Sequence, residues 1–192
     1  MIATNKQRHI KLNKVLVLFA SSHVDGKTSK LLKFYLNELV GSRKNQANFF
    51  EVKKINIYDL KILPCDGCGF CKHGEGCPKN EFDDFSEIVS LIKRSNCFVV
   101  ATPTYFSGFP AKLKALIDRC EQFYCSKTRL GRFKNFKKLQ GSLVLTAGGA
   151  NFNCLKNTIS SCKQFFDCID VEFEMCLAAP RTDTDGLFFL IN

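Results

Sequence analysis

Four cysteines crowd into one short segment of the chain, with a spacing that suits the binding of a metal or a cluster. They are Cys65, Cys68, Cys71 and Cys77, in the pattern C-x2-C-x2-C-x5-C, and a proline follows the last one. Structural zinc usually takes two Cys or His pairs separated by a longer arm. Three closely set thiolates with one more distant partner suit wrapping around a cubane iron–sulfur cluster. The spacing favours a cluster, with a zinc knot or a metal-free thiol loop as alternatives, and we expect His73 to be exposed rather than a ligand.

The other cysteines are scattered singly through periodic segments of the sequence. They are Cys97, Cys120, Cys125, Cys154, Cys162, Cys168 and Cys176. An odd total of eleven, with four of them in one cluster, does not resemble the disulfide framework of a secreted protein. The cysteine usage therefore predicts a reducing, cytoplasmic compartment and one thiolate ligand site.

Residues 21–29 follow a short apolar run and lead into a helical pattern, which makes them a candidate anion site. A helix start offers unsatisfied N–H groups and the positive end of the helix dipole. The segment is neither a Walker A sequence nor G-x-G-x-x-G, so a monophosphate fits better than a triphosphate or a dinucleotide. An ordinary capped turn is the alternative. The candidate residues are Ser21, Ser22, His23, Lys27, Thr28 and Ser29.

Two further segments follow predicted strands and could border a flat ring. In residues 102–108, Pro103 and Thr104 precede Tyr105 and Phe106, whose rings could pack beside a planar ligand; a hydrophobic plug over the next helix is the alternative. In residues 146–151, Gly148 and Gly149 would let the backbone approach a ligand without a Cβ in the way. Together the three segments predict a phosphate site and a planar-ring site on one rim.

Apolar runs alternate with helical patterns along the whole chain. Helical stripes begin near residues 31, 85, 110 and 155, and the stripe from Pro110 includes Cys120 and Tyr124 on its inner face. This alternation predicts an α/β fold: a doubly wound, five-stranded parallel sheet in three α/β/α layers, with ligands at the carboxyl ends of the strands. The predicted strands are residues 15–20, 49–57, 97–101, 143–147 and 171–177.

The organisation predicts one domain over residues 1–192. It would carry a basic arm at 1–13, a cysteine-rich loop at 63–80 and an irregular tail at 180–192. A composition of 45% hydrophobic and 24% charged residues excludes a disordered chain, and the longest apolar runs are too short to span a membrane. The apolar run at 15–20 is also shorter than a secretory signal requires.

The formal net charge of +10 makes an anionic cofactor, an acidic partner or nucleic acid plausible. A basic stretch before the fourth strand would steer an acidic ferredoxin, with a merely solvated loop as the alternative. Two phenylalanines interleave these charges, but no helix-turn-helix or RNA-binding signature accompanies them, which disfavours nucleic acid. The basic residues are Lys127, Arg129, Arg132, Lys134, Lys137 and Lys138.

With these motifs in order, the sequence resembles the flavodoxin-like NAD(P)H-dependent FMN reductase superfamily, and specifically its iron–sulfur flavoprotein branch. The resemblance runs from about residue 14 to 150 and is carried by residues 20–23 with 26–28, 64–77, 102–106 and 111–119. It implies a flavodoxin-like fold, non-covalently bound FMN, a [4Fe–4S] cluster and a homodimer or homotetramer. NAD(P)H is implied as a possible electron donor.

The resemblance also implies roles for individual residues. The candidates in residues 21–29 would surround the FMN phosphate, residues 103–106 would run along the isoalloxazine with Gly148 and Gly149 on its far side, and the four clustered cysteines would ligate iron. The sequence departs from the family where His23 replaces a common arginine and Lys27 a common asparagine. The fourth-strand loop also lacks the usual Gln-Glu, and the expected last helix is missing or replaced.

The resulting hypothesis is an electron-transfer flavoenzyme in which the flavin performs the chemistry, so we name no protein acid, base or nucleophile. Electrons would come from a ferredoxin or NAD(P)H and go to a small acceptor such as a quinone or an oxygen species. One alternative is a cluster-free NAD(P)H-dependent FMN or quinone reductase that keeps the cysteine loop only structurally. Another is a non-enzymatic, redox-responsive binding module.

Overall fold

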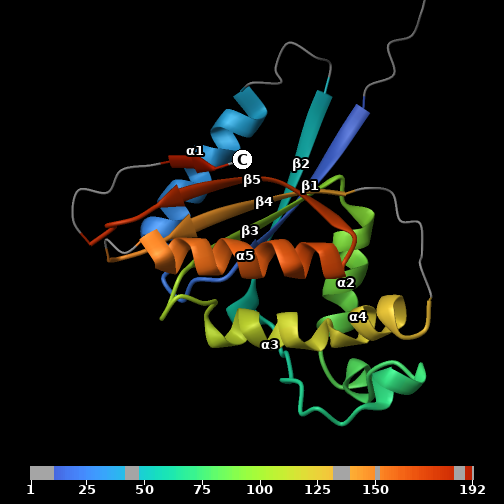
Figure 1. The fold of residues 1–192 in the computed structure, drawn as a ribbon. Helices are drawn as coiled ribbons and strands as arrows, with labels where there is room; N and C mark the ends of the chain where they lie inside the picture. Colours follow the sequence, from blue (N-terminus) through green and yellow to red (C-terminus); the bar gives the residue numbers. More distant parts are fainter. Residues whose placement is uncertain (1–10, 42–47, 132–138, 150–151, 184–188, 192) are drawn as a thin grey trace, which may run out of the picture.

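A single twisted sheet organises the molecule, with the strand order β2-β1-β3-β4-β5-β6 (Figure 1). The computed structural model describes residues 11–41, 48–131, 139–149, 152–183 and 189–191. The first five strands run parallel, and β6 pairs antiparallel with β5. The predicted five-stranded parallel, flavodoxin-like sheet is therefore confirmed, with one short strand added. The strands are β1 Lys11–Phe19, β2 Asn48–Asn56, β3 Cys97–Pro103, β4 Leu139–Thr146, β5 Val171–Ala179 and β6 Phe189–Ile191.

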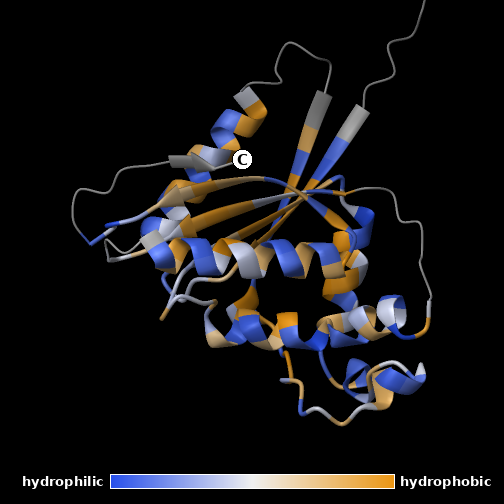
Figure 2. Ribbon diagram, in the orientation of Figure 1, coloured by the Kyte–Doolittle hydropathy of each residue, from blue (hydrophilic) through white to orange (hydrophobic). Residues whose placement is uncertain are grey.

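Helices cover both faces of the sheet, because each strand presents apolar side chains in both directions. One core cluster joins α1 to Val15, Val17 and Phe19, and a second joins α2, α3 and α5 to the opposite face (Figures 1 and 2). The three-layer prediction is thus confirmed. The helices are α1 Lys27–Gly41, α2 Phe85–Arg94, α3 Ala111–Arg119, α4 Glu121–Thr128 and α5 Phe152–Cys168, with 3₁₀ turns η1 Ile57–Asp59, η2 Phe70–His73 and η3 Pro78–Glu81. In the described part of the chain, every helix is too short or too polar to cross a membrane.

The helix predicted from Pro110 is divided in two at Cys120. The Cys120 N–H donates to the Ile117 carbonyl at 2.9 Å, which tightens the end of α3, and the Cys120 carbonyl accepts the first bonds of α4. Tyr124 in α4 is 52% exposed, so its predicted place on the inner face is wrong. A periodic apolar stripe cannot reveal such a break, because both helices keep an apolar face.

The prediction of an irregular tail from residue 180 is wrong at its end, where β6 forms. Three residue pairs join β6 to β5, from Cys176 with Ile191 to Ala178 with Phe189. Between the two strands, the N–H groups of Arg181 and Thr182 donate to the carbonyls of Gly149 and Ala147. This part of the chain therefore lies against the loop that follows β4.

The strand β2 forms one edge of the sheet. It pairs with β1 alone, and Glu51, Val52, Lys53 and Lys54 are all exposed. The ammonium group of Lys54 lies 4.2 Å from the ring centroid of Phe19. The lysine side chain therefore covers part of the apolar surface of β1. The opposite edge of the sheet is the short β6.

Parallel pairing brings the loops after β1, β3 and β4 to the same side of the molecule. The ladder continues past the strand ends through three backbone bonds: Ala20 N–H to Ala101, Thr104 N–H to Thr146 and Ala147 N–H to Ala179, each at 2.7–2.9 Å. These are the three segments in which the sequence placed its phosphate and ring candidates. We call them together the strand-end rim (residues 21–29, 102–108 and 146–149).

Candidate functional site

The first loop of the strand-end rim ends in the start of α1, as an anion site requires. The Gly26 N–H donates to the His23 carbonyl at 3.1 Å, which closes a tight turn, and the first helical bond runs from Lys30 N–H to Gly26 at 3.2 Å. The N–H groups of Lys27, Thr28 and Ser29 therefore point out of the helix start. The helix dipole adds a partial positive charge at the same place.

The six candidate side chains of this loop divide into two groups. Ser22, His23 and Lys27 are exposed, whereas Ser21, Thr28 and Ser29 are buried. The Thr28 hydroxyl lies 2.8 Å from the hydroxyl of Thr146, and Ser21 Oγ accepts the His23 N–H at 3.2 Å. The hydroxyls of Thr28 and Ser21 thus hold the loop in place, which leaves N–H groups and exposed cations as its anion-binding groups.

The second loop is a tight turn that lifts two aromatic residues into solvent. Tyr105 and Gly108 exchange backbone bonds at 2.9 and 3.0 Å, and Phe106 and Ser107 between them adopt φ values of 49° and 64°. The Thr104 hydroxyl bonds to the Gly108 carbonyl at 3.2 Å and lies 2.7 Å from the Thr158 hydroxyl of α5. Residues other than glycine rarely adopt a positive φ, so the backbone of this turn is strained and fixed in shape.

The exposure of Tyr105 and Phe106 argues against the alternative of a hydrophobic plug at this loop. Phe106 is fully exposed and Tyr105 half-exposed, whereas the adjacent Phe109 is buried in the core. Phe109 therefore fills the entry to α3. Tyr105 and Phe106 remain available to contact a ligand at the rim, as the sequence predicts.

The two glycines of the third loop differ in their surroundings. A Cβ at Gly148 would lie 2.2 Å from an Asp183 oxygen, whereas a Cβ at Gly149 would have open space around it. The approach of a ligand to these glycines stays a prediction, and Gly148 has a further role within the protein. There the missing side chain makes room for Asp183, which belongs to the segment between β5 and β6.

Two side chains near the ring loop were missed by sequence reasoning. Burial raises the pKa of Tyr58, and the nearby Tyr105 raises it further, so the phenol stays protonated close to the turn. On α5, Cys154 Sγ accepts a hydrogen bond from Ser107 Oγ at 3.1 Å. Neither residue lies in a motif, and both reach the turn only through the packing of η1 and α5 against it.

The cysteine loop (residues 63–83) gathers its four motif cysteines around one cavity. Cys65, Cys68, Cys71 and Cys77 all line this cavity, whose volume is 360 Å³. Cys65 and Cys68 are exposed and the other two half-buried. Among the described residues, no three His, Cys, Asp or Glu side chains are gathered closely enough to hold a single metal ion. His73 is exposed, as predicted.

Glycines give this loop its tight turns. Gly69 and Gly74 flank η2 with φ values of 82° and 87°, and Gly67 and Gly76 are also positive, at 71° and 77°. A left-handed backbone is readily adopted only by glycine. The loop can therefore fold back on itself and present thiols from several directions.

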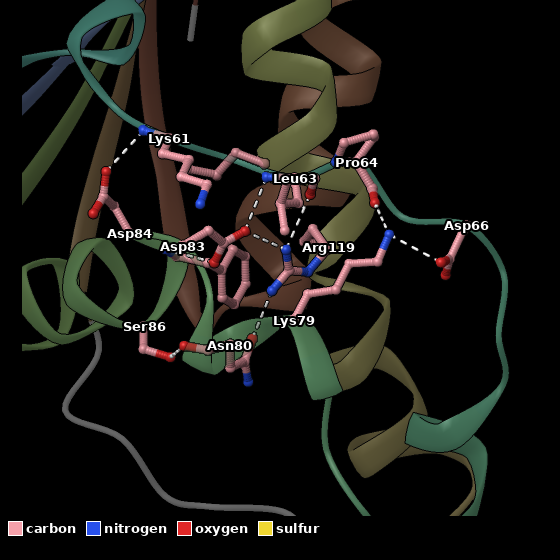
Figure 3. Close-up of polar contacts among 12 residues, drawn as sticks. Lys61, Leu63, Pro64, Asp66, Lys79, Asn80, Asp83, Asp84, Ser86 and Arg119 are labelled. Atoms are coloured by element: carbon pink, nitrogen blue, oxygen red, sulfur yellow. Dashed lines mark hydrogen bonds and ion pairs between the residues drawn. The ribbon is translucent and has the colours of Figure 1, made fainter.

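One buried arginine at the end of α3 joins the two ends of the cysteine loop (Figure 3). Arg119 Nη1 donates to the Leu63 carbonyl at 3.0 Å and to Asp83 Oδ2 at 2.5 Å, and Nη2 donates to Asn80 Oδ1 at 2.8 Å. The side chains of Arg119 and Asp83 are both 0% exposed. We call these four residues the Arg119 clasp. Breaking a buried pair by removing one partner destabilises a protein by about 3–5 kcal/mol.

The carboxylate of Asp83 accepts further bonds within the clasp and from the start of α2. Besides Arg119, it accepts the N–H groups of Leu63 at 2.9 Å and Phe85 at 3.2 Å. Burial alone would raise the pKa of Asp83, but the hydrogen bonds from Arg119 and the two N–H groups outweigh it, and the net shift is downward. Asp83 therefore stays charged and holds both the loop and the start of α2.

A weaker contact lies on the outside of the same loop. Lys79 Nζ donates to the Pro64 carbonyl at 2.8 Å and lies 3.0 Å from Asp66 Oδ2 (Figure 3). The hydrogen bond from Lys79 lowers the pKa of Asp66. Because the Asp66 side chain is 58% exposed, water screens this ion pair.

A fifth thiol, from α4, adjoins the cysteine loop. Cys125 is buried, and its Sγ lies 3.9 Å from Cys71 Sγ and 3.4 Å from Glu121 Oε1. Burial, with smaller contributions from Glu121 and Cys71, raises the pKa of the Cys125 thiol to about 11. No local signal in the sequence marks this contact, because the two cysteines are 54 residues apart and Cys125 is one of the cysteines scattered singly through periodic segments.

The predicted basic stretch is only partly described by the structure. Lys127 bonds to the Asp167 carbonyl at 2.6 Å and pairs with Asp170 at 2.5 Å, so it connects α4 to the turn before β5. Arg129 is exposed at the end of α4. Arg132, Lys134, Lys137 and Lys138 lie outside the described residues. A steering role for this stretch stays a prediction.

The two candidate regions lie at different ends of α3 (Figure 1). The aromatic turn of the strand-end rim leads into its first residue, and Arg119 of the clasp is its last. Lys112, near the start of α3, also donates to the Leu60 carbonyl at 3.0 Å. The nine-residue helix therefore has one end at the rim and the other at the cysteine loop.

Comparisons with known proteins agree with this geometry. The family model described as NADPH-dependent FMN reductase matches residues 13–170. An iron–sulfur flavoprotein of Archaeoglobus fulgidus is 32% identical over 135 residues, which cover 70% of this chain and 55% of that protein. One from Methanocaldococcus jannaschii is 29% identical over 153 residues, which cover 80% of this chain and 71% of that protein. The matched region therefore spans only about half to seven-tenths of these relatives.

Solved structures share the fold at low sequence identity. An FMN-dependent NADH-azoreductase of Bacillus anthracis, solved in complex with FMN, superimposes with a TM-score of 0.62 at 19% identity, covering 90% of this chain and 89% of that one. At this identity the likeness shows the flavodoxin-like fold. Together with the matched family model, it leads to one conclusion: this chain belongs to the NADPH-dependent FMN reductase family, in which it is similar to the iron–sulfur flavoproteins.

Proposed function

We propose that this protein is an FMN-dependent oxidoreductase that binds FMN at the strand-end rim and carries a [4Fe–4S] cluster in the cysteine loop. The observation that carries the flavin proposal is that the loops after β1, β3 and β4 meet at the carboxyl ends of the strands. The strand-end rim has the start of α1 in its first loop and exposed aromatic side chains in its second. A phosphate group and a planar ring need these two environments side by side.

The phosphate would bind at the start of α1. The N–H groups of Lys27, Thr28 and Ser29 and the exposed side chains of Lys27 and His23 fit a doubly charged anion. The Thr28–Thr146 bond sets the position of this helix start against β4. His23 stands where the family commonly has an arginine, and Lys27 stands where the family commonly has an asparagine, so both basic side chains of this site differ from the common pattern.

The ring would lie along the aromatic turn and the third loop. Tyr105 and Phe106 offer apolar surface next to Pro103 and Thr104, and Gly149 leaves open space on the other side. The bonds of Thr104 to Gly108 and Thr158 keep this surface in one arrangement. The protein residues would thus orient the ring and limit the approach of water and of other reactants.

Bound FMN supplies hydride and single-electron chemistry, which no side chain of the rim could supply. The chain's own part is to bind and orient. The rim presents hydroxyls, amides, cations and aromatic rings, and Tyr58, whose pKa is raised, stays protonated beside it. We therefore assign no acid–base catalyst among these residues.

The cysteine loop would hold the cluster through Cys65, Cys68, Cys71 and Cys77. These four thiols surround one cavity, and the loop carries the positive-φ glycines that let its backbone wrap around a compact group. The Arg119 clasp would keep the two ends of the loop together while the cysteine thiols lose their protons and bind iron. An iron–sulfur cluster is held by such sets of thiolates.

NAD(P)H or an acidic ferredoxin is the electron donor that we propose, with a small acceptor such as a quinone or an oxygen species. The net charge of +10 would favour an acidic protein donor. Raising the salt concentration should then slow electron delivery from a ferredoxin. If the rate of delivery does not change with salt, the steering role is wrong.

The flavin site is tested by comparing FMN with riboflavin, which lacks the phosphate. Protein freed of flavin should bind FMN with a Kd on the order of micromolar or tighter, and riboflavin at least tenfold more weakly. The loss of flavin fluorescence on binding measures both. Equal affinities would place the phosphate outside the α1 start, and failure to bind either would overturn the flavin proposal.

The cluster is tested by iron and sulfide analysis of protein purified without air. The Cys71→Ser variant should lose most of its iron and sulfide yet bind FMN as before, because the two sites lie on different loops. Cys97→Ser, at the start of β3, is the matched control and should keep both. Full iron content in the Cys71→Ser variant would count against this ligand.

A cluster-free NAD(P)H-dependent FMN or quinone reductase is the second candidate. Relatives named FMN-dependent NADH:quinone oxidoreductase match at 26% identity. Wild-type protein purified without air that contains FMN but no iron or sulfide would favour this candidate.

A further inference from the structure

Cys71 belongs to the predicted cluster site, yet it also contacts a thiol on a helix outside the motif. Its Sγ is 3.9 Å from Sγ of Cys125, which is buried in α4. A disulfide requires about 2.05 Å between the sulfurs, so the two atoms are about 2 Å from bonding distance. The contact joins parts of the chain that are 54 residues apart.

The two cysteines differ in how far they can move. Cys125 lies inside α4, where the helical bonds fix its backbone, and its side chain has no exposed surface. Cys71 lies in the four-residue turn η2, which packs against α4 and is flanked by the positive-φ glycines Gly69 and Gly74. A small rotation of this turn about its two glycines would bring the Cys71 sulfur to Cys125 without disturbing the helix.

The two cysteines also differ in their access to solvent. Cys71 is half-buried and lines two cavities: the cavity of the four cysteines and a neighbouring one of 220 Å³ between α2, α4 and the turn before β5. A small oxidant can therefore reach Cys71 from either side. Cys125 lines neither cavity, so it would react with Cys71 rather than with the oxidant.

We propose that Cys71 and Cys125 form a disulfide when the cysteine loop lacks its cluster and the protein meets a peroxide. The Cys71 thiolate attacks one peroxide oxygen, the O–O bond breaks, and a sulfenic acid and one water form. The Cys125 sulfur then attacks the sulfenic sulfur, the S–O bond breaks, and a second water leaves. The two thiols lose two electrons and two protons, and hydrogen peroxide is reduced to two waters.

Such a bond would protect the site and would be reversible. The sulfenic acid is consumed before further peroxide can oxidise it irreversibly, and a dithiol reductant restores both thiols. While the bond persists, Cys71 cannot ligate iron, so the oxidised protein should not rebuild a cluster. This role goes beyond the proposed electron transfer and needs neither flavin nor NAD(P)H.

The test uses the full-length protein, freed of iron with a chelator, reduced, and then treated with an equimolar amount of hydrogen peroxide. After the remaining thiols are alkylated, digestion and mass spectrometry should find the peptides of Cys71 and Cys125 joined in most molecules. Treatment with dithiothreitol should separate them. If Cys71 is found joined to another motif cysteine, or as a sulfinic acid, the proposal is overturned.

Two variants sharpen the result. Cys125→Ser should lose the cross-link and accumulate over-oxidised Cys71, whereas Cys168→Ser, which removes another α-helical thiol near α4, should keep the cross-link. Uptake of FMN shows whether each variant is folded, and the wild-type cross-link decides the question even if a variant fails to fold. Absence of iron from protein made without air would instead contradict the proposed cluster. The disulfide assay uses iron-free protein, so its result does not depend on whether a cluster is present.

Discussion

The strand-end rim and the cysteine loop differ in what holds them in place. Backbone bonds that extend the parallel ladder fix the rim, and the Thr28–Thr146 contact ties it to α1. The cysteine loop lies away from the sheet, and the buried side chain of Arg119 joins its two ends. The rim is therefore a product of the fold itself, whereas the shape of the loop depends on a few side chains. Substitutions should affect the two regions separately.

The largest expected effect comes from Arg119→Met. It leaves Asp83 as a buried charge without its cation, so the free energy of unfolding should fall by about 3–5 kcal/mol, as measured by urea denaturation. The matched control is Lys114→Met on the same helix, which removes the half-exposed Lys114–Asp118 pair and should change the free energy by less than about 1 kcal/mol.

The strand-end rim and the cysteine loop can be compared directly in Arg119→Met by measuring its FMN binding and its iron content. Below its unfolding temperature, the variant should bind FMN as the wild type does, while its iron content falls. Equal losses of FMN and iron would contradict the separation of the two regions. Equal stabilities of Arg119→Met and Lys114→Met would contradict the clasp.

Acid should weaken the clasp through Asp83. Because the pKa of Asp83 is lowered in the folded protein, its carboxylate stabilises the fold fully above the ordinary value of 3.8, and this contribution is lost as the pH falls through the folded-state pKa. The stability difference between wild type and Asp83→Asn should therefore shrink on acidification below pH 3.8. A difference that stays constant with pH would show that the charge of Asp83 is unimportant.

Thr28→Val should have a smaller effect, confined to the rim. Loss of the hydrogen bond to Thr146 should lower the free energy of unfolding by about 1 kcal/mol and weaken FMN binding by about fivefold, without changing the iron content. The control is Thr128→Val, which removes a hydroxyl bonded to a carbonyl on the surface of α4. Unchanged FMN affinity in Thr28→Val would mean that α1 keeps its position without this contact.

Lys79→Met should have the smallest effect on stability. The Lys79–Asp66 pair is largely solvated, so its removal should leave the unfolding midpoint unchanged within error. Hydrogen exchange in residues 64–68 should become faster, because the Pro64 carbonyl also loses a donor. A loss of stability as large as that of Arg119→Met would show that the outer side of the loop matters as much as the clasp.

The sheet and the rim could be predicted because their signals are local. Apolar runs such as 97–101 fill strands buried on both faces, and parallel pairing brings their following loops together whatever those loops contain. The exposed aromatics at Tyr105 and Phe106 were found in this way. What occupies the space beside Gly148 could not be found, because Asp183 reaches it through the path of a distant segment.

The supports of the cysteine loop could not be predicted, because they depend on contacts between segments that are far apart in sequence. Arg119 is the last residue of an amphipathic helix, a position where arginine is common and exposed, and Asp83 fits an ordinary acidic lead into α2. Their pairing is visible only when α3 packs across the loop. Cys125 is likewise one of the cysteines scattered singly through periodic segments, and nothing in its sequence neighbourhood indicates the contact with Cys71.

The edges of the sheet limit how a second copy of the chain could associate. Charged side chains at Glu51, Lys53 and Lys54 line β2, and the other edge consists of the three-residue β6. Charged or very short edges discourage strand-to-strand joining between molecules, which is also the first step of fibril growth. A homo-oligomer of this protein would therefore assemble through helices or loops, and a continuous sheet across two subunits is disfavoured.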